Sequence, residues 1–429
     1  MLCEKKNLNL HPMNAKKVHL IYIIGLLSTF LVGACCSDEM TLSRPGRPGE
    51  TLSRTLVIYM AGENSLSTYL QNDSLEIAWG IDSLPENTRV VLYMDDTKST
   101  RLCVGAPGTP LQTVKSYDSN LCSTNSATMA YVLQDIFATY PAETYGLIMC
   151  SHASGWLFDD PTTRSADTTA APGGPRRSFG IDNGQRSGSN SGPRLNIPAL
   201  AGVLAGCPHL DFLMFDACFM QCIEVAYELR NVADYIIASP AEIPAPGAPY
   251  NQMLRSLCTA PTDIDAIVHS YTDYYYSGWM SQSYGGAELT AIRTDLLPLL
   301  ARSTAPLLRS LLAGRNELNL DYVQRYFPTL SSNIYPAYID LKNLFYHYLD
   351  AANYASWVRI FDATVPVQSL SPQWYSAFGS SRFQSVTDIN HCGGVSVYVP
   401  RSRHQTYGWV SDYHGLEWYE ATGLSSTYW

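Results

Sequence analysis

The feature that most constrains the fold is a series of short apolar runs separated by helix-like segments. The runs lie at residues 56–60, 89–94, 145–150, 209–215 and 235–239, with another at 394–399. Each has the length of a strand and is mostly apolar, which is typical of strands buried on both faces. The helix-like segments are 65–80, 126–139 (capped by Asn125 or Ser126), about 218–230 and most of 262–315. Strands alternating with helices predict an α/β fold, a mostly parallel sheet with helices on both faces, followed by a C-terminal extension of helices and a strand.

The N-terminal region has the pattern of an export signal. Four lysines precede residues 20–34, an uncharged run too short to cross a bilayer comfortably. The run ends at Ala34-Cys35-Cys36, which resembles a bacterial lipobox, with Val32 favouring Cys35 over Cys36 as the lipidation site. We therefore expect residues 1–35 to be a lipoprotein signal peptide and 36–54 a tether. This predicts an exported bacterial lipoprotein at the outer membrane or cell surface, held by an N-terminal lipid; an ordinary cleaved signal or an uncleaved anchor is the alternative.

Composition excludes several classes of protein. Hydrophobic residues make up 46% of the 429 residues and charged residues 15%, which excludes a chain that is disordered as a whole. The net charge of −10 argues against nucleic acid as a partner. The cysteines after the lipobox are scattered, so at most one or two bridges are expected, with Cys103–Cys122 as a candidate. No pattern of metal ligands is visible, and no D-x-D-x-D-G loop supports calcium, so no cofactor is predicted.

A long polar segment separates the third and fourth predicted strands. Residues 159–194 are rich in Ser, Thr, Gly, Pro and Arg and contain few apolar residues. Loops of this length in a compact domain are usually functional or cleavable. We expect it to lie on the surface.

Reactive side chains follow two of the predicted strands. His152 comes after the third strand, and Cys218 comes after the fourth, where a helix is expected to begin. Ligands of open parallel sheets bind at the carboxyl ends of the strands. A thiol at a helix N-terminus has a lowered pKa, and a neighbouring imidazole lowers it further and protonates a leaving amine. The pattern fits a Cys218 nucleophile and a His152 base, and it fits a buried cysteine and a loop histidine equally well.

Three segments make the interpretation specific. "TLVIYMAGENSLS", "YPAETYGLIMCSHASGW" and "FDACFMQCIEVAYELR" resemble the clostripain family of cysteine peptidases (the C11 group), which share the caspase/gingipain-like fold. The resemblance covers about residues 55–250 well and continues weakly to about 400. It implies a caspase-like peptidase domain over 55–400, with 159–194 as a loop insertion and 401–429 as a tail packing on the domain.

The resemblance assigns roles to particular residues. It implies Cys218 as nucleophile and His152 as general base, with no third member required. Backbone N–H groups of Ala153 and Cys218 would form the oxyanion hole. The family has glycine where this chain has Ala153; if that position needs a positive φ, alanine costs about 1 kcal/mol and displaces the donor.

Specificity and maturation are also implied by the resemblance. Family members mostly cleave after Arg or Lys, and Asp216 resembles the carboxylate that pairs with a basic P1 side chain, although Asp also suits a helix N-cap. Glu242 would be a second acid, where the family often has Ser-Glu-Glu. Relatives are often cleaved between the histidine and cysteine strands, so we expect autocleavage in 159–194, at Arg164, Arg176 or Arg177.

The sequence thus predicts a cysteine endopeptidase that hydrolyses peptides and proteins, after Arg or Lys, by a Cys/His dyad. The alternative is a catalytically weak surface lipoprotein of the same fold that binds peptide or glycan through its aromatic-rich C-terminal half. A transferase using the same Cys/His pair also fits these residues.

Overall fold

A computed structural model describes residues 47–118, 121–157, 178–182, 184–190, 192–313, 317–327, 338–377, 381–427 and 429. The predicted signal peptide, Cys35 and the first part of the tether lie outside the described residues. The predicted cleavage sites Arg164, Arg176 and Arg177 lie outside them as well. In the part of the chain that is described, no helix has both the length and the apolar character needed to cross a membrane.

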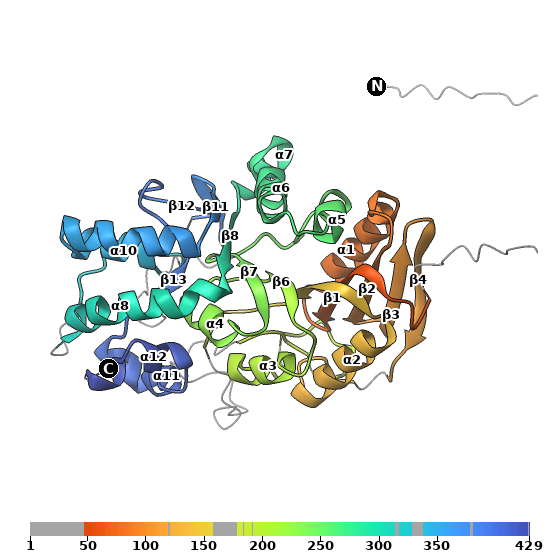
Figure 1. The fold of residues 1–429 in the computed structure, drawn as a ribbon, viewed down its shortest axis with the longest axis horizontal. Helices are drawn as coiled ribbons and strands as arrows, with labels where there is room; N and C mark the ends of the chain where they lie inside the picture. Colours follow the sequence, from red (N-terminus) through yellow and green to blue (C-terminus); the bar gives the residue numbers. More distant parts are fainter. Residues whose placement is uncertain are drawn as a thin grey trace, which may run out of the picture. The chain divides into compact units, whose positions relative to one another are not determined.

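The main sheet has nine strands in the order β10-β8-β7-β6-β5-β1-β2-β3-β4 (Figure 1). Five neighbouring strands are parallel, namely β7 (Ala233–Ala238), β6 (Leu210–Asp216), β5 (Ala142–Cys150), β1 (Leu52–Gly62) and β2 (Thr88–Asp96). They correspond to the first five apolar runs of the sequence. Antiparallel strands flank them: β8 (Glu288–Arg293) and β10 (Val367–Leu370) on one side, β3 (Thr100–Ala106) and β4 (Thr109–Ser116) on the other. The predicted α/β fold class is confirmed.

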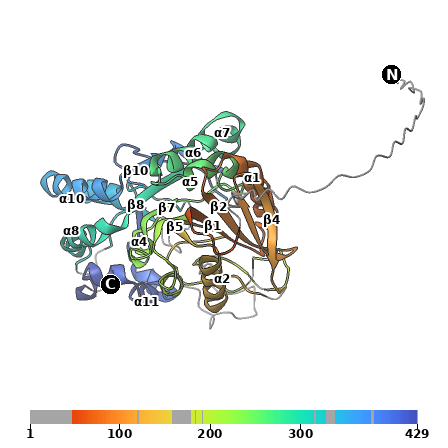
Figure 2. The same ribbon diagram turned by 45° about the vertical axis from the view of Figure 1, so that its right-hand side comes forward.

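Both faces of the parallel strands are buried, which explains why the corresponding runs are mostly apolar. Alternate side chains of β1 enter two separate hydrophobic clusters: Leu56, Ile58 and Met60 on one face, and Val57, Tyr59 and Ala61 on the other. The first face is covered by α1 (Ser67–Gly80), α5 (Tyr250–Cys258) and α6 (Ile264–Tyr276), followed by α7 (Gly278–Tyr284) (Figures 1 and 2). The second is covered by α2 (Ser126–Thr139), α3 (Ile197–Leu204), α4 (Ile223–Glu228) and α8 (Leu297–Leu311).

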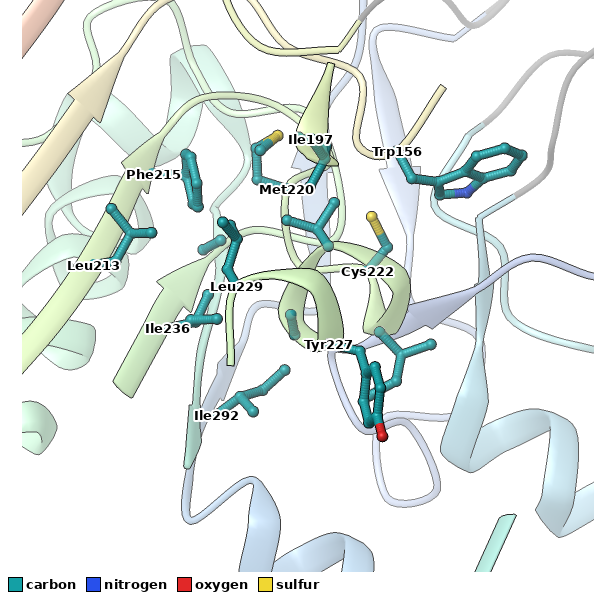
Figure 3. Packing of buried hydrophobic residues seen from close by; sticks show 14 of the residues in the cluster. Trp156, Ile197, Leu213, Phe215, Met220, Cys222, Tyr227, Leu229, Ile236 and Ile292 are labelled. Atoms are coloured by element: carbon teal, nitrogen blue, oxygen red, sulfur yellow. The ribbon is translucent and has the colours of Figure 1, made fainter. Parts of the chain in front are cut away.

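The second cluster extends under the short helix α4. Figure 3 shows Leu213 and Phe215 of β6 together with Met220, Cys222 and other buried members of this cluster. Burying one such side chain contributes about 1.5–3 kcal/mol, so this packing fixes the end of β6 firmly. Beyond β8, helix α12 (Glu417–Ala421) contacts α4 and α8, and α11 (Trp409–Tyr413) precedes it.

Two predicted helices match closely. Segment 65–80 forms α1, and segment 126–139 forms α2 with the predicted bounds. Of the two cap candidates, Asn125 is the N-cap, because its side chain accepts hydrogen bonds from the N–H groups of Ala127 and Thr128.

The predicted helix from Cys218 is wrong at its start. Residues 217–221 form a turn, and α4 begins only at Ile223, with Cys222 as its N-cap. The turn is held by the chain that follows β7: Phe219 N–H donates to the Ala241 carbonyl and Gln221 N–H to that of Ser239, each at 2.9 Å. These tertiary hydrogen bonds outweigh the local helix propensity. Cys218 therefore does not feel the helix dipole that the sequence suggested.

The C-terminal half is less regular than expected. The segment 262–315 is interrupted by β8, and the predicted strand at 394–399 is only β13 (Ser396–Val397), which pairs with β9 (Ile339–Asp340) outside the main sheet. The other elements are α9 (Leu341–Tyr348), α10 (Ala351–Thr364), the pair β11 (Gln373–Tyr375) and β12 (Phe383–Ser385), and 3₁₀ turns at Ile81–Ser83, Thr294–Leu296, Ser402–Tyr407 and Leu424–Ser426.

The predicted Cys103–Cys122 bridge is also wrong. Both thiols are free, and Cys103 lies inside β3 rather than in a loop. In that strand Cys103 is buried and pairs with Leu92 of β2, so it packs as a small hydrophobic residue.

Candidate active site

The two predicted catalytic side chains extend from adjacent strands. In the pairing of β5 with β6, Cys150 is the partner of Asp216. His152 and Cys218 each lie two residues beyond this pair, at the same edge of the sheet. Both line one cavity of about 450 Å³, whose walls come from α1, from the segments that follow β1, β5, β6 and β7, and from the C-terminal half of the chain. Parallel strands about 4.8 Å apart thus bring together an imidazole and a thiol that are 66 positions apart in the sequence.

Cys218 is distinguished from the other cysteines by its surroundings. Within the described part of the chain it is the one cysteine that lines this cavity, and its Sγ accepts a hydrogen bond from Ile243 N–H at 3.5 Å. Cys150, on the adjacent strand, and Cys222, four residues after Cys218, are buried, and burial raises the pKa of both thiols well above the ordinary value. Neither is suited to act as a nucleophile.

The residue after Cys218 has a strained backbone. Phe219 has φ of +61°, which is a rare conformation for a bulky residue. Its ring is buried and stacks on Tyr338, with 4.9 Å between centroids, and Tyr338 itself has φ of +43°. Strain of this kind costs about 1–3 kcal/mol and is found mainly at functional sites. Here both strained residues line the cavity.

The His152 loop is held on three sides. Ser65 Oγ lies 2.9 Å from His152 Nε2. The His152 carbonyl accepts from Gly180 N–H at 2.8 Å, and Ser154 N–H donates to the Ser178 carbonyl at 3.1 Å. Residues 178–180 of the segment predicted as a surface loop are therefore buried against the His152 loop, so that prediction is wrong for this part of the segment. Ser65 was not singled out from the sequence, although its place just after the first buried strand puts it at the same sheet edge.

The alanine at position 153 does not carry the expected strain. Among the described non-glycine residues, the positive φ values occur at Asn87, Arg186, Phe219 and Tyr338, so Ala153 is not in the left-handed region. Glycine is needed two residues later. Gly155 has φ of +67°, and a Cβ there would lie 2.8 Å from Cys222 Sγ and 2.9 Å from the Phe219 carbonyl oxygen. The cost predicted for Ala153 therefore does not arise.

Asp216 is a buried wall of the cavity and not a helix cap. It is 5% exposed, and Oδ2 accepts from Ala248 N–H at 3.0 Å and from the Tyr250 hydroxyl at 3.1 Å. Oδ1 has no hydrogen-bond partner among the described residues. Burial raises the pKa of Asp216, against the effect of hydrogen bonds from Ala248, Tyr250 and Tyr271. A carboxyl in this situation is suited to a cationic group that enters from the cavity.

Two further acids line the same cavity. Glu242, the predicted second acid, accepts from the Ser376 hydroxyl and from Ala377 N–H, so its carboxylate is already engaged. Asp73, on the inner face of α1, was missed by the sequence analysis, because a polar residue in a predicted helix is normally expected to face solvent. It is 2% exposed.

Comparison with known proteins adds the decisive observation. Residues 58–429 match the profile described as Peptidase_C11: Clostripain family. The chain belongs to the clostripain family. No curated protein is significantly similar over the chain. The resemblance seen in the three sequence segments is thus confirmed, and the protein is a clostripain-like cysteine peptidase.

Solved structures agree with this assignment. A secreted C11 cysteine protease from Bacteroides thetaiotaomicron, in complex with an irreversible peptide inhibitor, is 28% identical, with a TM-score of 0.71 over 87% of this chain and 100% of that one. An inactive zymogen C11 protease from Parabacteroides distasonis is 25% identical, with a TM-score of 0.69 over 87% of this chain and 99% of that one.

One group of carboxylates among the described residues of this clostripain-family chain has the spacing needed to hold a metal ion. Ligand atoms of Glu63, Asp95 and Asp182 lie within 4.8 Å of one another. Arg186 already supplies a positive charge there, with Nη1 2.7 Å from an Asp95 oxygen and 3.6 Å from one of Glu63. Glu63 also accepts from Ser187 N–H. The group therefore fastens residues 184–187 to the ends of β1 and β2.

Proposed function

We propose that this clostripain-family peptidase is an endopeptidase that cleaves after Arg or Lys, with Cys218 as nucleophile and His152 as general base. The observation that carries the proposal is the shared cavity. It is lined by the thiol, the imidazole and the buried carboxyl of Asp216, one oxygen of which has no partner among the described residues. A thiol beside a buried acid fits a peptide whose carbonyl reacts at the first while its basic side chain pairs with the second.

Acylation follows from the groups at the strand ends. The thiolate is favoured by the protonated imidazole and by the hydrogen bond that Ile243 N–H donates to Sγ. Cys218 Sγ attacks the scissile carbonyl carbon, and the electron pair of the C=O bond moves to oxygen, where the N–H groups of Ala153 and Cys218 stabilise it. The tetrahedral species collapses, His152 protonates the departing amine, and a thioester remains.

Deacylation reverses the proton movement. His152 removes a proton from water, the hydroxide adds to the thioester carbonyl, and the thiolate leaves as the carboxylic acid forms. The Ser65 hydroxyl, 2.9 Å from Nε2, keeps the imidazole ring in one orientation through both halves of the cycle. The clamp of residues 178–180 on the His152 loop has the same effect on its backbone.

The test is a set of peptides that differ only at P1. Purified residues 37–429 are assayed on one sequence with Arg, Lys, citrulline or Leu at P1. Citrulline has the shape of arginine without its charge, so the Arg/citrulline ratio of kcat/KM isolates the ion pair. A ratio well above 10 is expected. Equal rates would refute the preference for basic residues, and an inert protein that a P1-Arg thiol probe fails to label would favour the peptide- or glycan-binding alternative.

We also propose that the chain cuts itself at Arg164, Arg176 or Arg177. These arginines lie in a polar segment of the kind where nicking concentrates, between strands that contribute to one sheet. That a related protein is described as an inactive zymogen is consistent with maturation. Purified wild type is expected to give two bands on a denaturing gel and one species in gel filtration, because β5 and β6 remain paired.

The control for self-processing is the Cys218→Ala chain, which is expected to remain a single band under the same conditions. Equal nicking of this variant would mean that another protease makes the cut. The triple variant Arg164→Ala/Arg176→Ala/Arg177→Ala then separates cleavage from activity. Full activity of the uncut triple variant would show that cleavage is not needed for activation.

We propose that the protein is exported and anchored by lipid at Cys35, with Cys36 as the alternative. The support is the lipobox-like end of the apolar run and the polar tether that follows it. In a bacterium that processes lipoproteins, the full chain is expected to incorporate labelled fatty acid and to sediment with membranes. The double variant Cys35→Ser/Cys36→Ser should lose both properties; unchanged sedimentation would point to an uncleaved anchor.

A further inference from the structure

Two buried carboxyls face each other across a single glycine at the base of the cavity. A Cβ built on Gly247 would lie 2.7 Å from Asp216 Oδ2 and 3.4 Å from Asp73 Oδ2. Gly247 has φ of +69° in a turn closed by its N–H and the Pro244 carbonyl. Only glycine allows this turn to pass so close to both acids. The two carboxyls therefore flank the same point of the cavity lining.

At Asp73 Oδ2, no hydrogen bond within the described part of the chain compensates for burial. The Asp73 residue is 2% exposed. Asp216 Oδ1 is likewise buried without a hydrogen-bond partner among the described residues. A buried carboxyl oxygen without a donor costs folding free energy, and such groups are retained mainly where a ligand completes them.

We propose that Asp73 is a second recognition carboxyl for the P1 side chain, protonated while the pocket is empty and ionised when a basic side chain enters. The inference rests on the proposed function and deepens it, because it adds a specificity-determining residue and a proton to the same pocket. The chemical balance is simple: the carboxyl releases one proton to the buffer, and the resulting carboxylate pairs with the incoming guanidinium or ammonium. No bond other than O–H is broken.

The surroundings of Asp73 support a neutral empty state. Burial, followed by the nearby carboxyls of Asp216 and Glu76, raises the pKa of Asp73 to about 10. The remaining titratable groups that interact with it are neutral acids at pH 8 and bring no compensating positive charge. They are Cys150 of β5, Tyr250 of α5, and Tyr271, Tyr274 and Tyr275 of α6. Burial and the neighbouring carboxyls thus keep Asp73 protonated until a cation arrives.

The kinetic test uses Asp73→Asn, since asparagine has the shape of a protonated aspartate. The Arg/citrulline ratio of kcat/KM is expected to fall about 10- to 100-fold, while the rate on the citrulline peptide hardly changes. Asp82→Asn is the matched control. It makes the same change at an exposed carboxyl just after the end of α1 that does not line the cavity, so the ratio should be retained.

A second readout counts the proton. In the Cys218→Ala background, which binds peptide without cleaving it, calorimetry at pH 8 in two buffers of different ionisation enthalpy gives the protons released. The P1-Arg peptide should release about one proton more than the citrulline peptide. In the Cys218→Ala/Asp73→Asn chain this difference should vanish. The melting temperature of Asp73→Asn should be no lower than that of the parent.

The outcomes separate the two proposals. If the wild type itself does not prefer Arg to citrulline, the proposed function fails. If the wild type prefers Arg and Asp73→Asn retains both the ratio and the proton release, only the second-carboxyl inference is wrong. A lower melting temperature together with equal losses on the Arg and citrulline peptides would also overturn it, because Asp73 would then be structural.

Discussion

Replacing Cys218 with alanine is expected to abolish peptide hydrolysis and leave the fold intact. The side chain that is removed is small and half-buried, at a turn held by backbone hydrogen bonds from Phe219 and Gln221 that the substitution does not touch. Without the thiol there is no acyl-enzyme, and loss of a covalent nucleophile lowers turnover by roughly 10³-fold or more. The measurement is kcat/KM on the P1-Arg peptide, together with the melting temperature.

His152→Ala is expected to lose nearly as much, because nucleophile and base act as one unit and their losses do not add. Cys207→Ala is the matched control. Cys207 is another partly buried cysteine, burial raises its pKa to about 11, and it does not line the cavity. The activity of the Cys207→Ala protein should equal that of wild type. Retention of more than about a tenth of the activity in Cys218→Ala would refute the assignment of the nucleophile.

The sheet could be predicted because its signal is local. Each of the five parallel strands is buried on both faces. β1 shows why the strand centres are apolar: its alternate side chains enter two different clusters, while polar residues such as Arg54 and Asp216 occur toward the strand ends. Once the strands are known, the rule that parallel strands end at one edge brings His152 and Cys218 together. The outer strands gave weaker signals, because β4 exposes most of its side chains to solvent.

The parts that could not be predicted depend on distant contacts. The turn at Cys218 follows from hydrogen bonds to residues 239 and 241, which lie on the next strand connection and outweigh a helical pattern that was present locally. Asp73 and Ser65 are polar residues in or beside α1, and such residues are usually solvated. Their role depends on which face of α1 lies against the ends of β5 and β6, and this is set by tertiary packing that no local pattern records.

Asp216→Asn is expected to reduce kcat/KM for the P1-Arg peptide by roughly 30- to 5,000-fold, since loss of one partner of a buried charge pair costs about 2–5 kcal/mol. The citrulline and Leu peptides should lose little, because they bring no charge to the pocket. Glu242→Gln is the informative comparison. The Glu242 carboxylate already accepts hydrogen bonds from Ser376 and Ala377, so we expect a smaller change in specificity.

The stability of Asp216→Asn distinguishes recognition from a structural role. Burial holds the folded-state pKa of Asp216 above its unfolded value, so the folded chain binds the proton more tightly than the unfolded chain. This carboxyl therefore reduces stability as the pH rises above about 3.9, the ordinary pKa of Asp. Asparagine removes that penalty, so the melting temperature of the Asp216→Asn protein at pH 8 should be no lower than that of wild type. Loss of a helix cap would instead reduce the free energy of unfolding by about 1 kcal/mol and lower the melting temperature. A drop in melting temperature with equal losses on all peptides would show that Asp216 supports the end of β6 and not the substrate.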